Sequence, residues 1–280
     1  MRTKDKARTE LPPESEQREW DKSCDRRFYD YYASKSQSEA TLLRFESIRD
    51  AVLRVLRQNQ LPTLKLDVAD IGCGAGTQSF VWATSGHNVH AIDINEPLLS
   101  LAKDRAAKYE YDIEFRVGSA TALPWPNGSM NVCLVPEVLE HVQGWQTCLD
   151  EFTRVLRPGG LLFLTTTNRL CPIQEEFTLP LYSWYPARLK RYYEGLATGE
   201  RPEIVNYAKY PAVNWFSFYG LRAELGRRGL RSLDRFDVMN MSGKSLSKRV
   251  LASLIRALPP MRLLAHFASP GTMIVGIKEI

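Results

Sequence analysis

The sequence predicts an α/β fold in which helices cover both faces of a doubly wound, mostly parallel seven-stranded sheet. Two observations lead to this fold class. Short apolar runs alternate with helical stretches between residues 64 and 167. Strands that alternate with helices need crossover connections, which make neighbouring strands parallel. Several runs, such as 132–135, are apolar throughout, which is typical of a strand covered on both faces.

The composition of the 280-residue chain is that of an ordinary globular protein, with 44% hydrophobic and 25% charged residues. Residues 1–20 are polar and lack an apolar core, so we expect a disordered tail and no signal peptide. No run approaches 18 apolar residues, so no membrane span is expected. The five cysteines are odd in number and form no CxxC pair, which argues against a disulfide framework and a zinc site. A cytoplasmic protein is therefore expected.

The predicted core elements follow one another along the chain. Residues 21–60 are expected to form an N-terminal helical cap, because apolar residues recur at a spacing near 3.6 over 37–58. Residues 61–167 form the predicted core, with strands at 66–71, 89–93, 113–117, 130–136 and 161–167. Helices are expected between these strands, at 78–85, 96–109 and 145–156.

The remaining residues form two further predicted segments. Residues 168–215 interrupt the alternation and are rich in Tyr, Trp and Pro, so we interpret them as an aromatic-rich insertion after the fifth strand. Residues 216–280 are expected to complete the sheet, with a helix over 217–228 and strands at 230–238 and 272–278. Between these strands, 245–258 is predicted to be a basic amphipathic helix that Pro259 and Pro260 end.

A glycine-rich turn and a later acid together predict a nucleoside-binding unit. The turn over 72–76 follows a strand and opens a helix, so its bare backbone lets a ligand approach the free N–H groups of the helix start. Asp93 ends the next strand, 23 residues after Asp70. A carboxylate at that place can accept hydrogen bonds from both hydroxyls of a ribose.

The glycine spacing decides between two nucleoside cofactors. A dinucleotide fingerprint requires GxGxxG, but Thr77 stands where the last glycine should be. The spacing is GxGxG, with an acid two residues before Gly72. The run Asp70-Ile71-Gly72-Cys73-Gly74-Ala75-Gly76-Thr77 resembles the first motif of class I S-adenosylmethionine-dependent methyltransferases. A nicotinamide oxidoreductase is therefore disfavoured.

Further motifs extend the resemblance over about residues 64–167. The runs Pro-Glu-Val-Leu-Glu-His-Val at 136–142 and Arg-Val-Leu-Arg-Pro-Gly-Gly at 154–160 resemble the ubiquinone- and menaquinone-biosynthesis type of this family. The family's Rossmann-like fold and its cofactor, S-adenosyl-L-methionine, are what the resemblance implies. Ser119 and Asn131 depart from the family, which often has Asp at both positions.

The resemblance also implies which residues hold each part of the cofactor. Its methionine end would lie at the turn, with its ribose at Asp93 and Ile94 and its adenine at Ser119 and Ala120. The turn residues concerned are Asp70, Gly72, Cys73, Gly74 and Gly76. The methyl group would face the stretch that begins at Pro136 and Glu137 and ends at His141.

His141 is the candidate catalytic base, because it alone of the four histidines follows a strand expected at the site. Its ordinary pKa near 6.5 lets it accept a proton at neutral pH. The same side chain could instead hold the loop and cofactor in place, and both interpretations stay open. No metal is predicted, although Glu137, Glu140 and His141 have suitable ligand chemistry.

The acceptor is predicted to be a small, hydrophobic molecule that is methylated on oxygen or carbon. The aromatic residues of 168–215 are expected to form its pocket, as a lid, or else to make a small core of their own. Glu175 and Glu176 could be bases in that pocket or surface charges, and surface charge is favoured. No oligomeric state is predicted.

The basic C-terminal quarter leaves a choice of partners. A basic amphipathic helix can lie on an anionic membrane, so peripheral membrane contact through 245–267 is one expectation, and packing over a sheet face is the other. A nucleic-acid partner is disfavoured because no RNA- or DNA-binding module is recognisable. An RNA methyltransferase and a non-catalytic protein that binds S-adenosylmethionine remain the alternative functions.

Overall fold

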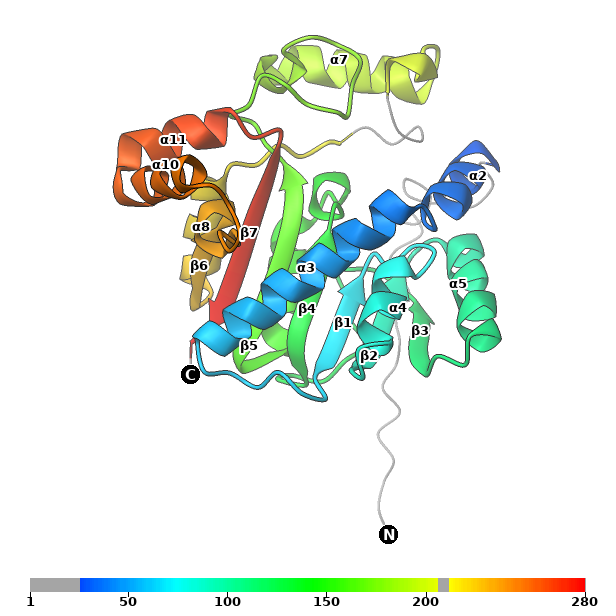
Figure 1. The fold of residues 1–280 in the computed structure, drawn as a ribbon. Coiled ribbons are helices and arrows are strands. Elements are labelled where there is room, and N and C mark those ends of the chain that lie inside the picture. Colours follow the sequence, from blue (N-terminus) through cyan, green and yellow to red (C-terminus); the bar gives the residue numbers. More distant parts are fainter. Residues whose placement is uncertain (1–25, 206–211, 280) are drawn as a thin grey trace.

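The computed structural model describes residues 26–205 and 212–279, so the predicted tail at 1–20 lies outside the described residues. The described residues form one seven-stranded sheet in the order β3-β2-β1-β4-β5-β7-β6, with helices on both faces (Figure 1). The strands are β1 (Asp67–Ile71), β2 (Asn88–Asp93), β3 (Ile113–Val117), β4 (Met130–Pro136), β5 (Leu156–Thr167), β6 (Leu230–Asp234) and β7 (Gly271–Lys278). The predicted α/β class is thus confirmed.

The sheet is mixed, which corrects the expectation of a mostly parallel one. Strands β1 to β5 pair in parallel, whereas β7 runs antiparallel to both of its neighbours, β5 and β6. The start of β7 explains its direction, because Gly271 pairs with Thr167 at the end of β5. The chain enters β7 from the edge where β5 leaves the sheet, so β7 has to run back along it.

The helices before the third strand are α2 (Arg26–Lys35), α3 (Glu39–Gln58), α4 (Thr77–Ala83) and α5 (Glu96–Lys108). Those that follow β4 are η1 (Leu139–His141), α6 (Trp145–Val155), η2 (Tyr182–Trp184), α7 (Ala187–Thr198), η3 (Pro202–Ile204), α8 (Phe218–Arg227), α9 (Arg235–Val238), α10 (Leu246–Ala257) and α11 (Pro259–Phe267). In Figure 1, α3 crosses one face of the sheet and α7 lies beyond the carboxyl ends of its parallel strands.

Alternate residues of the central strands build two separate cores. Val132 and Leu134 of β4 pack with the cluster that contains Val52 of α3. Cys133 and Val135 of the same strand join the cluster on the opposite face, which includes residues of α6 and α8. Side chains of a strand point alternately to its two faces, so a wholly apolar strand is what a doubly covered sheet requires.

Among the described residues of 168–215, the aromatic side chains of Phe177, Tyr182, Tyr185, Tyr193 and Trp215 form a small core of their own. The rings of Phe177 and Tyr182 stack with centroids 3.9 Å apart, and the ring of Trp215 packs edge-on against Tyr182 at 5.5 Å. Lys190 places its ammonium group 4.3 Å from the centroid of Trp215. These contacts are those of a separate small core, which is one of the two alternatives for this segment.

Two predicted boundaries in the second half of the chain are wrong, and a helix that follows the predicted stop at Pro259 was not predicted. The strand expected at 230–238 ends at Asp234, because the side chain of Asp234 caps α9 in a capping box with Asp237. The fifth strand begins at Leu156 rather than 161, with a register shift against β4. Pro259 starts a second helix, α11, since proline is well suited to the first position of a helix.

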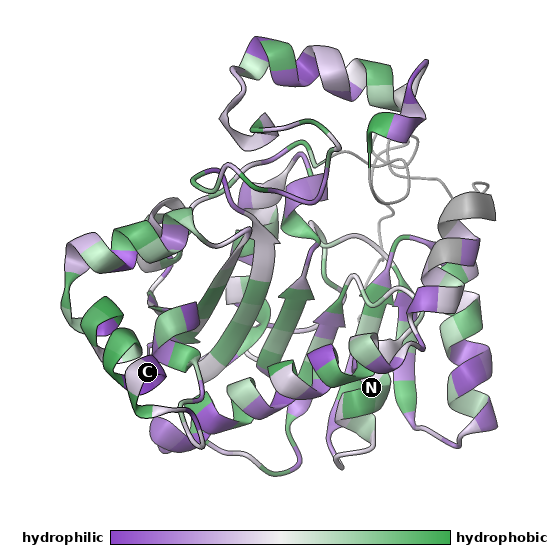
Figure 2. Ribbon diagram, turned by 45° about the horizontal axis from the view of Figure 1, so that its top comes forward, coloured by the Kyte–Doolittle hydropathy of each residue, from purple (hydrophilic) through white to green (hydrophobic). Residues whose placement is uncertain are grey.

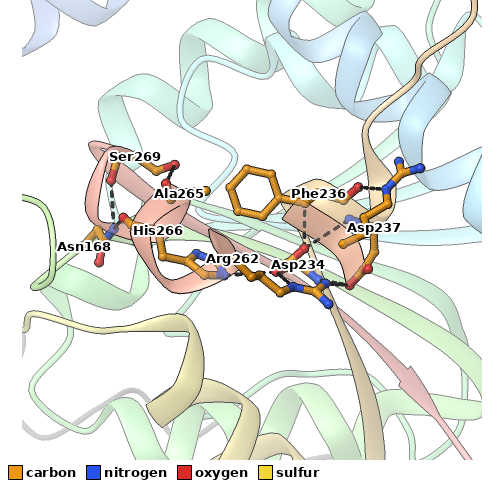
Figure 3. A network of polar contacts seen from close by, with 9 residues as sticks. Asn168, Asp234, Phe236, Asp237, Arg262, Ala265, His266 and Ser269 are labelled. Atoms are coloured by element: carbon orange, nitrogen blue, oxygen red, sulfur yellow. Dashed lines mark hydrogen bonds and ion pairs between the residues drawn. The ribbon is translucent and has the colours of Figure 1, made fainter. Parts of the chain in front are cut away.

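A buried ionic network attaches α11 to the sheet (Figure 3). The carboxylate of Asp234 is fully buried and accepts a hydrogen bond from Nε of Arg262 at 2.6 Å. His266 places Nε2 3.0 Å from the same carboxylate, and Asp237 also pairs with Arg262. These charges hold the pKa of Asp234 well below its usual range. The last turns of the chain before β7 therefore depend on one buried acid.

Replacing that acid should destabilise the protein strongly. In Asp234→Ala, Arg262 and His266 lose their buried counter-charge, and the free energy of unfolding should fall by about 3–5 kcal/mol. In the partly exposed Asp237→Ala, the loss should be only about 1 kcal/mol. Urea unfolding followed by circular dichroism measures both. Equal losses in the two variants would show that the network does not depend on Asp234.

Candidate functional site

A cavity of about 500 Å³ opens where β1, β2 and β4 end at the carboxyl edge of the sheet. In open α/β sheets, ligands bind at this edge, where the direction of strand order reverses. The order β3-β2-β1-β4 reverses between β1 and β4. The described residues that line the cavity come from the turns after β1 to β4, from α2 and α3, and from residues 175–176.

The glycine turn forms the floor of the cavity. Its amides are tied to the next strand, since the N–H groups of Gly72 and Cys73 both donate to the carbonyl oxygen of Ile92, at 2.8 and 3.1 Å. Gly72 has φ +75°, and a Cβ added there would lie 2.3 Å from Cγ2 of Val138. Only glycine therefore fits between the strand end and the loop after β4.

The carboxylate of Asp93 joins this turn to the end of β2. One oxygen accepts the N–H of Gly74 at 2.7 Å, and the other accepts the N–H of Asn95 at 2.7 Å. Burial raises the pKa of Asp93, and the backbone hydrogen bonds oppose that rise. Each carboxylate oxygen can accept more than one hydrogen bond, so both remain able to receive hydroxyl groups from the cavity.

The loop after β3 forms one wall of the cavity. The N–H of Gly118 donates to the carbonyl oxygen of Asp93 at 3.0 Å, which places Ser119 and Ala120 beside that acid. The hydroxyl of Ser119 lies 2.8 Å from that of Thr121 and accepts the N–H of Thr121 at 3.2 Å. The Ser119 side chain thus stabilises the loop in which it lies by hydrogen bonds to Thr121.

The far end of the cavity is acidic. Glu140 is only 1% exposed, and its carboxyl accepts the hydroxyl of Thr166 at 2.8 Å, while burial raises its pKa well above the usual range. Burial and the neighbouring charges of Glu137 and Glu175 raise the pKa of Glu176 to about 7. Glu176 therefore belongs to the cavity, which corrects the expectation that it is a surface charge.

Asn214 braces the loop that presents His141 at this acidic end. Its side-chain amide donates to the carbonyl oxygens of Leu139 at 3.1 Å and Val142 at 2.7 Å. The backbone carbonyl oxygen of Asn214 accepts a hydrogen bond from the hydroxyl of Thr167, the last residue of β5, at 2.9 Å. The loop over 139–142 is therefore held in place by Asn214, a residue more than 70 positions later in the chain.

Residues 69–164 match the family model described as a methyltransferase domain. This segment is a methyltransferase domain. The resemblance stated from the motifs is thereby confirmed for the part of the chain that carries the glycine turn, Asp93 and the loop with His141.

Curated relatives of the methyltransferase domain share part of their length with this chain. The chain is 32% identical over 179 residues to the ubiquinone biosynthesis O-methyltransferase of Brucella anthropi, covering 62% of this chain and 63% of the relative. It is 35% identical over 155 residues to the protein of the same name from Caulobacter vibrioides, covering 53% and 57%. The chain thus spans about three fifths of the length of these relatives.

Solved structures share the fold of the methyltransferase domain at low sequence identity. The PH0226 protein of Pyrococcus horikoshii covers 89% of this chain and 99% of its own, with a TM-score of 0.53 and 15% identity. The YcgJ protein of Bacillus subtilis covers 81% and 98%, with a TM-score of 0.50 and 17% identity. At this level of identity the likeness concerns the fold alone.

Most of the residues predicted for the site lie together in the methyltransferase domain's cavity. They are Gly72, Cys73, Gly74, Asp93, Ile94, Ser119, Ala120, Pro136, Glu137 and His141. Two predicted residues do not line it. Gly76 packs against α5, where an added Cβ would lie 2.9 Å from Cβ of Ala102. Asp70 lies buried beneath the turn, bound by Nε2 of Gln78 at 2.9 Å and Oγ of Ser79 at 2.6 Å.

The contribution of α2 and α3 to the cavity was not predicted from the sequence. Tyr32, Lys35, Thr41, Arg44 and Phe45 line it from these helices. Arg105 of α5 holds the end of α2 by donating to the carbonyl oxygen of Ala33 at 2.9 Å, and Arg44 pairs with Glu137 at 2.5 Å. The aromatic-rich run at 29–32 was the available signal, because a fully solvated helix rarely needs such residues.

No three His, Cys, Asp or Glu side chains converge as a metal site within residues 26–205 and 212–279. The acids at the cavity are distributed along its wall rather than around one point. The arrangement offers a proton acceptor and a carboxyl-lined space.

The buried Asp70 should make stability depend on pH. Burial raises its pKa from 3.8 to about 6, so the folded chain holds this proton more tightly than the unfolded chain. The group's contribution to stability is full below about pH 3.8 and is lost as the pH rises through about 6. Between pH 4 and 7, Asp70→Asn should therefore gain about 3 kcal/mol relative to the wild type.

Denaturant titrations of both proteins at intervals between pH 4 and 7 measure this gain. Other acids with raised pKa values titrate in both proteins, so the difference between the curves isolates Asp70. A difference that stays constant over this range would mean that Asp70 is ionised in the folded chain throughout.

Proposed function

We propose that the chain transfers a methyl group from S-adenosyl-L-methionine to a small hydrophobic acceptor, on oxygen or on an activated carbon. The observation that carries the proposal is the single cavity that combines the glycine turn, the Asp93 carboxylate and an acidic end with His141. The first two suit a nucleoside with a ribose, and the third suits an acceptor that has to lose a proton.

The residues present fit this cofactor. A volume of about 500 Å³ lies within the range of small-molecule and cofactor sites. A Cβ at Gly74 would meet no atom closer than 4.0 Å, so bare backbone faces open space there. Gly72, Cys73 and Gly74 would hold the methionine end, Asp93 and Ile94 the ribose, and Ser119 and Ala120 the adenine. When bound, the cofactor supplies a methyl group that is already activated by a positive sulfur.

The chain's own residues would then bind, orient and deprotonate the acceptor. Pro136 and Glu137 border the space between the cofactor residues and His141. His141 would take a proton from an acceptor hydroxyl, and the buried Glu140, with its raised pKa, can donate a hydrogen bond to the same acceptor. The relatives named ubiquinone biosynthesis O-methyltransferase support an aromatic hydroxyl as the acceptor group.

Two neighbouring segments complete the proposal. Residues 21–60, of which 26–60 are described, would cap the cofactor end, and residues 168–215, described except for 206–211, would close the acceptor end as a lid that contributes Glu175 and Glu176. An acceptor of this kind dissolves in lipid, so a cytoplasmic protein that touches the membrane through 245–267 suits it.

Calorimetric titration with S-adenosylmethionine, its demethylated product and NAD tests the cofactor assignment. We expect the first two to bind and NAD not to bind. Asp93→Ala should weaken binding of both by about 10- to 100-fold, because hydrogen bonds to a charged group are lost. The matched control is Asp67→Ala, whose carboxylate pairs with Arg157 at the opposite end of β1. Binding of NAD alone would end the proposal.

The base is tested by the rate of methyl incorporation into simple phenols at saturating cofactor. His141→Gln should lower kcat by about 10²- to 10⁴-fold while the affinity for the cofactor stays unchanged. Glu176→Gln should have a much smaller effect. If instead Glu176 is the base, the wild-type rate should rise with pH through about 7, and Glu176→Gln should abolish that rise.

A further inference from the structure

The helix α10 turns its apolar side away from the protein. Leu246, Val250, Leu254 and Leu258 recur every four residues, so they share one face of the helix. Their exposed fractions are 75%, 50%, 41% and 44%, and Leu251 beside them is 51% exposed. Ala252 is the buried residue of this helix. A helix that merely covered a sheet would bury such a face.

The helix α11 continues the exposed apolar surface. Leu263, Leu264 and Phe267 are 40%, 67% and 37% exposed. We call the exposed apolar residues of both helices, 246–267, the apolar ridge. In Figure 2 the two helices at the edge of the sheet carry much hydrophobic colour. The ridge gathers many exposed apolar residues in one short segment, unlike single exposed leucines elsewhere.

Single polar side chains of both helices bind the body of the protein. Arg262 and His266 of α11 reach inward to the buried carboxylate of Asp234 (Figure 3). Arg256 of α10 donates from Nε to the carbonyl oxygen of Phe236 at 2.7 Å. These bonds fix the orientation of the helices, so the ridge cannot turn inward without breaking them.

The charge beside the ridge is positive. Residues 238–278 contain no Asp or Glu at all. Lys244, Lys248 and Arg249 are exposed next to the start of α10, and no ion pair is recorded for these three among the described residues. An apolar surface flanked by unopposed cations is complementary to an anionic lipid bilayer, where each such cation is attracted to the surface.

The length of the helices favours a position in the plane of the bilayer. No single described helix is long and apolar enough to cross a membrane, and the two helices are bent by 109° at Leu258. At 1.5 Å per residue, neither would reach across a hydrocarbon core of about 30 Å.

The ridge lies at the same edge of the sheet as the cavity. Asn168 directly follows β5 and donates from Nδ2 to the carbonyl oxygens of His266 and Ser269, both at 2.8 Å. Glu140 at the acidic end of the cavity accepts the hydroxyl of Thr166, two residues before Asn168. A surface bound at α11 is therefore held beside the carboxyl edge of the parallel strands (Figure 1).

We propose that α10 and α11 form a peripheral docking element that embeds the apolar ridge in the interface of an anionic bilayer. The element would bring the acceptor end of the cavity next to lipid, so that a lipophilic acceptor reaches it without crossing water. The second part of this inference rests on the proposed function, whereas the docking itself does not.

Vesicle sedimentation with the full chain tests the docking. The probes are vesicles of phosphatidylcholine alone and of phosphatidylcholine mixed with phosphatidylglycerol. The wild type should pellet with the anionic vesicles, and high salt should weaken the binding. Leu254→Glu with Leu264→Glu should weaken it at least tenfold, and so should Lys244→Ser, Lys248→Ser and Arg249→Ser together. The matched control is Leu64→Glu, a leucine that is 84% exposed outside the ridge, which should leave binding unchanged.

Three results would overturn the proposal. They are failure of the wild type to pellet with anionic vesicles, equal loss in the Leu64→Glu control, and a wild-type dimer in sedimentation velocity that the ridge variants dissociate. The third result would assign the ridge to a second copy of the chain. Unfolding midpoints confirm that the variants fold. Calorimetry of the ridge variants with S-adenosylmethionine separates the proposals, because cofactor affinity should be unchanged even where docking is lost.

Discussion

The hydrogen bond between the Asp93 carboxylate and the amide of Gly74 determines the geometry on which the rest of the site depends. It holds the turn after β1 against the end of β2, and the bonds from Gly72 and Cys73 to Ile92 fix the same contact from the backbone. Asp70 supports the turn from below through Gln78 and Ser79 of α4. One acid therefore faces the cavity and the other supports the structure beneath it. Under the proposed function, this division assigns ligand binding to Asp93 and support of the turn to Asp70.

Carboxyl groups with raised pKa values gather around this cavity, which is unusual for a chain with a net charge of +5. Burial removes water from the carboxyl groups of Asp70, Asp93, Glu140 and Glu176. The charged form of each group is therefore disfavoured and its pKa is raised. Such a cluster costs folding stability near neutral pH. Active sites commonly contain groups whose pKa values are displaced by burial and by like charges, and this cost is consistent with a chemical role for the cavity.

The sequence was sufficient to predict the fold class and the contents of the cavity's floor. Strand periodicity and the glycine turn with Asp93 are local patterns, and local patterns can be recognised without knowing the tertiary structure. The contribution of Arg44 to the cavity and that of Asn214 to its loop were not predictable, because each acts from a distant part of the chain. For the aromatics of 168–215 the sequence left two alternatives open, because composition does not tell whether rings face a ligand or one another. The strand β6 ends at Asp234, four residues earlier than predicted, because the side chain of Asp234 caps the helix α9. A pattern of strand propensity does not reveal such a cap.

The brace at Asn214 links two regions that are distant in sequence. Its amide holds Leu139 and Val142 on either side of Glu140 and His141, while its backbone is bound to the end of β5. The stretch that contains Asn214 therefore controls how rigidly His141 is held. Under the proposed function, mutations in that stretch can slow turnover by loosening this loop. Evolution could adjust the enzyme's preference among acceptors there while the donor site remains unchanged.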